Sequence, residues 1–335
     1  MQTRSAGLGG DGDHPLLKWC KKYGQYIDKI SNLCYNLGRY EEMTLVSTRQ
    51  EEDWNPNTDK EENKMPAKSV AVAKGSDASG KTYEGLRRFN LVMGFLHLLQ
   101  GVLMIVLIIA FGKLKPYIIT TTIFTFDTGA QQLVPTLKQA FGLPFGPAVG
   151  AFLLISAIAH FSLATFGYKQ YVANLKKGMN PVRFYEYALS SSLMIVLIAL
   201  ISGVSDLGAL IALFGINACM NFFGIMMERH NQTTKRTDWI SFIYGCFAGI
   251  VPWIVIVLYF VLSIVSSDQK PPTFVYTIIP SLFIFFNIFA LNMYLQYKRV
   301  GRWKDYLFGE RMYIVLSLVA KTLLAWQVFA GVLAP

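Results

Sequence analysis

The chain has 335 residues, of which 53% are hydrophobic and 16% are charged, and its formal net charge is +10. The hydrophobic residues are concentrated after residue 88 in runs of about 20, the length at which a helix crosses ~30 Å of hydrocarbon. This distribution excludes a single soluble core and predicts an α-helical membrane domain surrounded by lipid. In a membrane protein a positive balance is typical of basic connections that face the cytoplasm, so we expect no nucleic-acid partner.

Residues 1–84 form a polar extension in front of the membrane domain, which we assign to 85–335. Within the extension, 14–43 has a rough helical periodicity of apolar residues with interleaved lysines. This pattern fits an amphipathic helix on a membrane surface or a partner, and it fits a weakly ordered tail as well. Residues 44–82 are rich in Glu, Lys, Asn, Ser and Gly, which is typical of a linker. We expect the extension to be cytoplasmic and largely disordered.

Seven apolar segments are long enough to be transmembrane helices. They lie at 88–112, 147–172, 182–203, 206–228, 239–265, 273–297 and 309–333. A very short turn at Gly203–Asp206 joins the third and fourth segments. Pro252 lies within the fifth, where neighbouring helices can satisfy the carbonyl that a proline leaves free. The expected fold class is therefore an all-α membrane protein with a seven-transmembrane-helix bundle.

The long connection between the first two spans predicts a β-hairpin. Its stretch Tyr117–Phe124 is β-branched and aromatic, and a second short candidate strand lies around Gln132–Val134. Between the two strands, Asp127-Thr128-Gly129 supplies residues that are typical of a turn.

Lys and Arg residues in the connections predict the direction of the spans, because these residues are enriched on the cytoplasmic side. The second, fourth and sixth connections hold twelve of them, and three more precede the first span, whereas the opposite side holds four. We therefore expect a cytoplasmic N-terminus, an extracellular C-terminus and the hairpin in the first extracellular loop. The plasma membrane is the expected location.

Lys321 is the most informative residue, because it lies about half-way along the last span. A charged lysine at this depth is costly unless it is paired. Its position alone leaves three interpretations open: half of a structural ion pair, an ion or proton site, or an amine that carries a carbonyl cofactor. A Schiff base suits a buried lysine, because desolvation favours the neutral amine that attacks an aldehyde.

Glu186 is the only carboxylate well inside a predicted span, which makes it the candidate counter-charge of Lys321. A protonated Schiff base in a low dielectric needs one nearby anion to hold its proton. Ser190 lies four residues after Glu186 and Ser317 lies four before Lys321, so both hydroxyls lie on the helical face of a charged residue. A structural Lys–Glu pair without a cofactor would show the same pattern.

Two histidines, His97 and His160, are also intramembrane and lie at about the depth of Lys321. One buried histidine is more often a structural hydrogen-bonder, but two beside a Lys–Glu pair favour a polar cluster that accepts or relays a proton. Other spans supply aromatic and polar residues that suit a slot for a flat conjugated chain. These residues are Tyr187, Asn217, Met220, Trp253, Phe285, Phe286 and Trp326.

Six stretches of the membrane part resemble the heliorhodopsin family. They are His97–Gln100, Ser156–Phe161, Glu186–Ser192, Gly249–Trp253, Tyr313–Lys321 and Leu324–Gln327. The resemblance covers about 85–335, and the long N-terminal extension departs from the short pattern of the family.

The resemblance implies all-trans retinal as a Schiff base on Lys321, with Glu186 as its counterion. It implies that further polar residues lie near the Schiff base, namely His97, His160, Ser156 and Ser190. It also implies a set of residues that line the retinal pocket, namely Tyr187, Asn217, Met220, Gly224, Phe286 and Trp326. A homodimer, an outer β-hairpin and the inverted membrane orientation that the basic connections predict belong to the same family pattern.

The implied function is light sensing with a slow photocycle, through a shape change that an unknown cytoplasmic partner detects. Efficient ion pumping is not expected, because the spans offer no second buried carboxylate and Leu193–Leu200 is purely aliphatic. A light-gated proton channel is the alternative, since some relatives conduct protons.

An enzyme is not expected either. Seven-span proteins of the progestin and adiponectin receptor group hold a catalytic zinc with three buried histidines, whereas only His97 and His160 are intramembrane here. The four cysteines also lack the spacing of a zinc motif or a disulfide framework, so no metal is expected.

Overall fold

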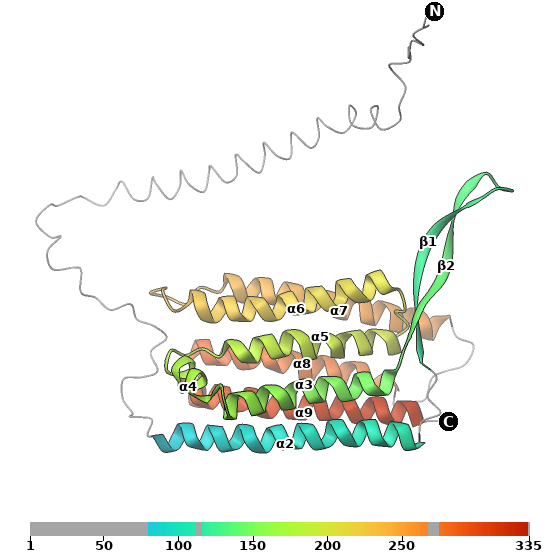
Figure 1. Cartoon of the computed structure of the whole chain (residues 1–335). Coiled ribbons are helices and arrows are strands. Elements are labelled where there is room, and N and C mark those ends of the chain that lie inside the picture. Colours follow the sequence, from blue (N-terminus) through green and yellow to red (C-terminus); the bar gives the residue numbers. More distant parts are fainter. Residues whose placement is uncertain (1–79, 112–115, 267–274, 334–335) are drawn as a thin grey trace, which may run out of the picture. The chain divides into compact units, whose positions relative to one another are not determined.

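The computed structural model describes residues 80–111, 116–266 and 275–333 of the chain (Figure 1). This part consists of seven long helices, a short helix α4 (Tyr168–Lys176), a 3-10 turn at Gly301–Lys304 and a β-hairpin. The predicted amphipathic helix at 14–43 lies outside the described residues, as does the predicted linker up to residue 79.

The seven long helices correspond to the seven predicted spans. Their bounds are α2 Gly80–Phe111, α3 Phe145–Ala164, α5 Pro181–Ile201, α6 Leu207–His230, α7 Ile240–Val265, α8 Val275–Lys298 and α9 Tyr306–Leu333. Among the described residues, α2, α3 and α5 to α8 are long and apolar enough to cross a membrane, and α9 is a further helix of 28 residues. The predicted seven-helix class with a hairpin is confirmed.

Packing between these helices closes a ring. Each long helix packs against the next one along the chain, and α9 returns to pack against α2. Consecutive long helices run in opposite directions, so the bundle has two different ends (Figure 1). One end carries α4 and the starts of α2, α5, α7 and α9, and it is called the α4 end below. The other end carries the hairpin and is called the hairpin end.

Helix α2 begins at Gly80, before the apolar segment that predicts it. Glu84 pairs with Arg87 and Arg88, which lie three and four residues later on the same face. Pairs at this spacing stabilise a helical turn even where no apolar stripe exists. The polar residues ahead of the span therefore extend the helix instead of ending it.

Helix α3 ends at Ala164, so the prediction that the second span continues to 172 is wrong. Arg87 Nε donates to the Ala164 carbonyl at 2.8 Å and satisfies an acceptor that a helix end leaves free. The chain then turns through Gly167, where an added Cβ would lie 2.8 Å from the Ser162 carbonyl oxygen. Only glycine fits this close backbone approach, and α4 begins directly after it.

The predicted hairpin is confirmed, and both strands are longer than the sequence indicates. β1 (Tyr117–Asp127) pairs antiparallel with β2 (Gln132–Leu143) and extends from the hairpin end of the bundle (Figure 1). Asp127 Oδ1 closes the turn by accepting the backbone N–H groups of Gly129 and Ala130 at 2.8 and 3.1 Å. The hairpin is tied to the short α5–α6 connection, because Thr120 N donates to the Ser205 carbonyl at 2.8 Å.

The half of the bundle toward the hairpin end has an apolar core. It is built from large side chains of α3, α5 and α7 that have no exposed surface: Phe152, Leu153, Ile195, Leu197, Ile198 and Ile256. Side chains packed in this way leave little room for water. The aliphatic part of α5 thus seals this half of the protein.

Candidate functional site

The amine of Lys321 lies inside the bundle and contacts three helices. The residue is only 3% exposed. Its Nζ lies 2.7 Å from Glu186 Oε1 on α5, 2.6 Å from Ser156 Oγ on α3 and 3.1 Å from Ser317 Oγ, one turn back on α9. Each of the three protons of a free ammonium group therefore has an acceptor.

Glu186 is also buried, and a second side chain holds its carboxylate. Ser156 Oγ lies 2.7 Å from Glu186 Oε1, so this hydroxyl bridges the amine and the carboxylate. The ring of Tyr187 lies 5.2 Å from Lys321 Nζ, a geometry in which the ring face attracts a cation. Ser190 is fully buried one turn after Glu186 on α5. The structure thus brings the predicted Lys–Glu pair and its serines together.

The two predicted histidines stack on each other, with ring centroids 5.4 Å apart and planes at 11°. His160 Nδ1 lies 2.8 Å from Asn90 Oδ1, and Asn90 Nδ2 donates to the Leu86 carbonyl at 2.9 Å. The amide oxygen of Asn90 is therefore the acceptor, and Nδ1 of His160 carries the proton. His97 is fully buried, and neither of its ring nitrogens has a hydrogen-bond partner among the described residues.

An apolar cavity of about 380 Å³ lies between α5, α6, α7 and α8. A second cavity of about 50 Å³ is lined by Lys321. The two share five lining residues: Tyr187, Met220, Asn221, Phe286 and Phe289. The amine therefore faces a small cavity that adjoins a larger one, whose volume is in the range of sites for small molecules.

Most of the predicted pocket residues line the larger cavity. These are Tyr187, Asn217, Met220, Gly224, Trp253 and Phe286. The structure does not bring Trp326 to either cavity: its side chain is 42% exposed and packs edge-on against Phe329. Phe285 does not line them either.

Two glycines give the cavity its width. An added Cβ at Gly249 would lie 2.6 Å from Met220 Sδ, and one at Gly224 would overlap the ring of Phe184. Side chains at these two positions would therefore displace residues of the cavity wall. The family resemblance implies that Gly224 lines the pocket, whereas for Gly249 it implies no such role: this glycine only begins the motif Gly249–Trp253.

A set of amides and hydroxyls on α5 and α6 forms a polar strip in the cavity wall. Asn217 Nδ2 donates to Ser191 Oγ at 2.9 Å and to Ser192 Oγ at 3.0 Å, and Asn221 Nδ2 reaches Ser191 Oγ at 3.2 Å. Sequence reasoning found Asn217 but missed Asn221. Asn221 lies four residues after Asn217 on the same helical face, and this spacing could have predicted its role.

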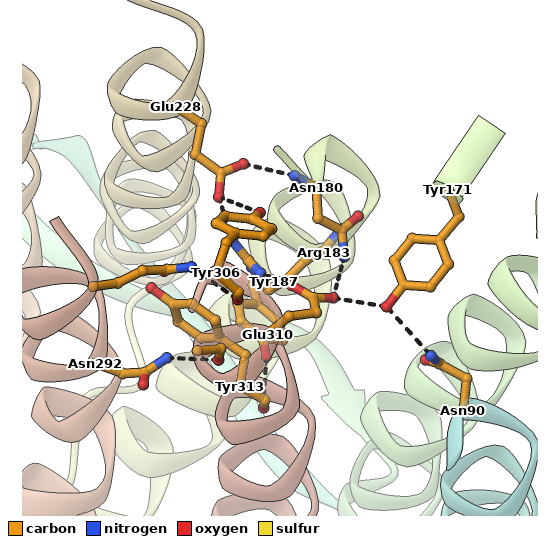
Figure 2. Close-up of polar contacts among 12 residues, drawn as sticks. Asn90, Tyr171, Asn180, Arg183, Tyr187, Glu228, Asn292, Tyr306, Glu310 and Tyr313 are labelled. Carbon is orange, nitrogen blue, oxygen red and sulfur yellow. Dashed lines mark hydrogen bonds and ion pairs between the residues drawn. The ribbon is translucent and has the colours of Figure 1, made fainter. Parts of the chain in front are cut away.

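The sequence also failed to predict a buried ion cluster at the α4 end, formed by Arg183, Glu228 and Glu310 (Figure 2). Arg183 Nη2 lies 2.5 Å from Glu228 Oε1, and Nη1 pairs with Glu310 Oε2. Tyr306 donates to Glu228 at 3.1 Å, and Asn180 donates to both carboxylates. All three charged side chains are almost fully buried, although each lies near the end of a helix.

Figure 2 shows Tyr171 between Glu310 of this cluster and Asn90, the residue that contacts His160. Its hydroxyl donates to Glu310 Oε1 at 3.0 Å and accepts a long hydrogen bond of 3.4 Å from Asn90 Nδ2. Burial raises the pKa of the Tyr171 hydroxyl well above its ordinary value, and the nearby Glu310 carboxylate raises it further. The hydroxyl therefore remains a donor, and a chain of contacts links His160 with Glu310.

The model of the heliorhodopsin family matches residues 86–333 of the chain. The chain belongs to the heliorhodopsin family. No curated protein matched it in sequence. Membership makes the protein an integral, multi-pass membrane protein of the rhodopsin type, a light-sensing class that carries a retinal chromophore. Heliorhodopsins are not a classical enzyme family.

The residues of this heliorhodopsin fit a retinal chromophore. Lys321 offers a buried amine, Glu186 offers one anion beside it, and the adjoining cavity has aromatic walls. The missing side chains at Gly224 and Gly249 leave space where a Cβ would collide with the cavity wall.

Replacing Arg183 should destabilise the protein strongly. Arg183→Met keeps much of the side-chain length but leaves two buried carboxylates without their cation, so the free energy of unfolding should fall by about 3–5 kcal/mol. Thermal unfolding of the purified protein in detergent measures the change. Arg88→Met is the matched control, because the Arg88 side chain is 79% exposed and should contribute little. Similar unfolding of both variants would contradict a stabilising role of the cluster.

Proposed function

We propose that this heliorhodopsin binds all-trans retinal as a protonated Schiff base on Lys321 and acts as a light sensor without efficient ion pumping. The observation that carries the proposal is the Lys321–Glu186 pair, joined at 2.7 Å, in which the Lys321 amine faces a small cavity that adjoins the large aromatic one. A structural ion pair alone would not require an apolar cavity beside it.

Retinal would supply an aldehyde that condenses with the amine and a conjugated chain that isomerises on absorbing light. Glu186 would compensate the positive charge, and Ser156 and Ser317 would hydrogen-bond the nitrogen or its counterion. Tyr187, Met220 and Phe286 line both cavities and would flank the chain. Trp253 packs edge-on against Phe286 at 5.4 Å and would close the far wall. His97 and His160, which stack on each other, would be available to accept a proton.

The distribution of polar groups supports a sensor over a pump. Ionisable groups lie at the depth of Lys321 and toward the α4 end, whereas the hairpin half has the buried apolar core around Leu197 and Ile198. A pump needs proton-carrying groups on both sides of the Schiff base. Proton movement would therefore stay within one half of the membrane, and a change in helix packing would be the output.

The membrane orientation and the partners belong to the same proposal. The basic connections all lie at the α4 end, which supports a cytoplasmic N-terminus and an extracellular hairpin in the plasma membrane. A homodimer and a signalling partner that reads the cytoplasmic face complete the proposed function. The exposed basic residues of α4 and of the α8–α9 connection are available for such a partner.

Lys321→Ala should abolish the pigment. Wild-type apoprotein mixed with all-trans retinal should develop a visible absorption band that the variant lacks, because no other described lysine faces the cavity. Absorption spectroscopy of purified protein measures this. Lys169→Ala, which removes an exposed lysine of α4, is the control and should keep the full band. A band of equal intensity in Lys321→Ala would refute the assignment of the Schiff base.

Glu186→Gln should shift the visible band or cause the Schiff base to lose its proton at a lower pH. The physical reason is that, in the part of the chain that the structure describes, Glu186 is the only anion within hydrogen-bonding distance of the amine. A pH titration of the absorption spectrum measures both effects. Glu84→Gln at the partly exposed start of α2 is the matched control. An unchanged spectrum would remove Glu186 from the role of counterion.

A light-gated proton channel is the second candidate function. Two polar contacts beyond Lys321 favour it: Thr322 Oγ1 donates to Gln100 at 2.8 Å, and Gln327 Nε2 donates to Ser281 at 2.9 Å. Both lie between the amine and the hairpin end, where the remaining core is apolar. We expect no photocurrent from voltage-clamped cells that express the protein with retinal. A light-induced current that depends on voltage and on the proton gradient would favour the channel.

A further inference from the structure

A small cavity separates the Lys321–Glu186 pair from the ion cluster at the α4 end. Its volume is about 20 Å³, and its lining includes His160, Glu186, Arg183 and Glu310. One water molecule needs roughly 10–15 Å³ and two to four polar partners. The cavity meets both conditions. In addition, Arg183 is 5% exposed, and its Nε has no hydrogen-bond partner among the described residues, so a donor beside the cavity needs an acceptor.

The ion cluster carries an excess of negative charge. Arg183 supplies one positive charge, whereas Glu228 and Glu310 supply two negative charges. Among the described residues, Tyr171, Tyr187, Tyr306 and Tyr313 also interact electrostatically with Glu310. None of these tyrosines compensates the excess, because a neutral phenol adds no positive charge. One additional proton would make the cluster neutral.

Glu310 is better placed than Glu228 to receive this proton. Glu310 lines the small cavity, and Glu228 does not. When Glu310 is neutral, Arg183 keeps its ion pair with Glu228 at 2.5 Å, so no buried charge is left unpaired. Glu228 also remains bonded to the backbone N–H of Asn180 at 2.8 Å and to the Tyr306 hydroxyl.

Asn90 and Tyr171 connect the two sides of the cavity through the contact between them that Figure 2 shows. Asn90 holds His160 through Nδ1, and Tyr171 holds Glu310 through Oε1. A side-chain amide does not readily pass on a proton, so the direct chain through Asn90 positions these groups without conducting. The remaining connection runs across the small cavity.

We propose that Glu310 is the inward proton acceptor of this heliorhodopsin and that a single water in the small cavity links it to Glu186 and His160. The proposal rests on the proposed function, in which the proton comes from the Schiff base on Lys321. A proton that has reached Glu186 or His160 then passes to the water, and the O–H bond of Glu186 or the N–H bond of His160 breaks. The same water releases one of its own protons to the Glu310 carboxylate, and the water is regenerated.

The first test uses the pigment and identifies the residue that takes up the proton. Light-minus-dark infrared spectra recorded while the Schiff base is deprotonated should show a protonated-carboxyl band that is absent from Glu310→Gln. Glu310→Asp should shift the band in frequency without removing it, which identifies the residue that carries the proton. Glu84→Gln, at the start of α2, is the control and should leave the band unchanged. A band that persists unshifted in Glu310→Gln would overturn the proposal.

The second test uses the same light-minus-dark spectra to compare the two carboxylates of the ion cluster by their effect on this band. Glu228→Gln should weaken it, because Arg183 then compensates Glu310 completely. A band lost in Glu228→Gln but kept in Glu310→Gln would assign the proton to Glu228 and overturn the proposal.

Ala159→Val tests the water without touching the ion cluster. Ala159 lines the small cavity, and the two added methyl groups should fill it. The carboxyl band should then appear more slowly after the flash, while the visible band in the dark stays intact. An unchanged rate would exclude the water link. A wild-type protein that forms no visible band would instead contradict the proposed function, so the two failures are distinguishable.

Discussion

A cation buried half-way along a transmembrane helix is the constraint on which this structure depends. Lys321 is stable there only because α3 and α5 approach α9 closely enough to bring Ser156 and Glu186 within hydrogen-bonding distance of its amine. The closed ring of helices holds these three elements at that separation. The same amine can condense with an aldehyde, so the group that constrains the packing is also the group that would carry the chromophore.

The polarity of the interior changes along the bundle axis. Buried charges, histidines and a cavity large enough for one water lie between Lys321 and the α4 end, whereas close-packed aliphatic side chains fill the hairpin half. Among the described residues, the buried charged and histidine side chains therefore lie at the depth of Lys321 or toward the α4 end. If Glu310 takes up a proton, as we propose, Arg183 keeps its ion pair with Glu228 alone, and the contact among the three helix ends changes. Such a change in pairing would alter the packing at the α4 end, which is the kind of local charge event that a switch protein converts into a signal.

The sequence determined the features that arise from local patterns. Apolar segments of membrane-spanning length gave the seven helices, and the alternation of β-branched residues with a turn at Asp127–Gly129 gave the hairpin. Lys321 and Glu186 could be paired in advance, because each is an isolated charge inside a long apolar segment and an unpaired charge is costly there. Residues four apart on one helix, such as Ser317 and Lys321, were also predictable from helical geometry.

Only the tertiary structure decided which residues at helix ends are buried and which aromatic side chains face the cavity. Arg183, Glu228 and Glu310 look in sequence like ordinary charges at a membrane boundary, and their burial depends on three helix ends meeting around Asn180. Trp326 lies five residues after Lys321 but points outward, because five residues along a helix rotate the side-chain direction by about 140°. The end of α3 depended on Arg87 of another helix. Contacts between segments distant in the chain set these features, and no local pattern records them.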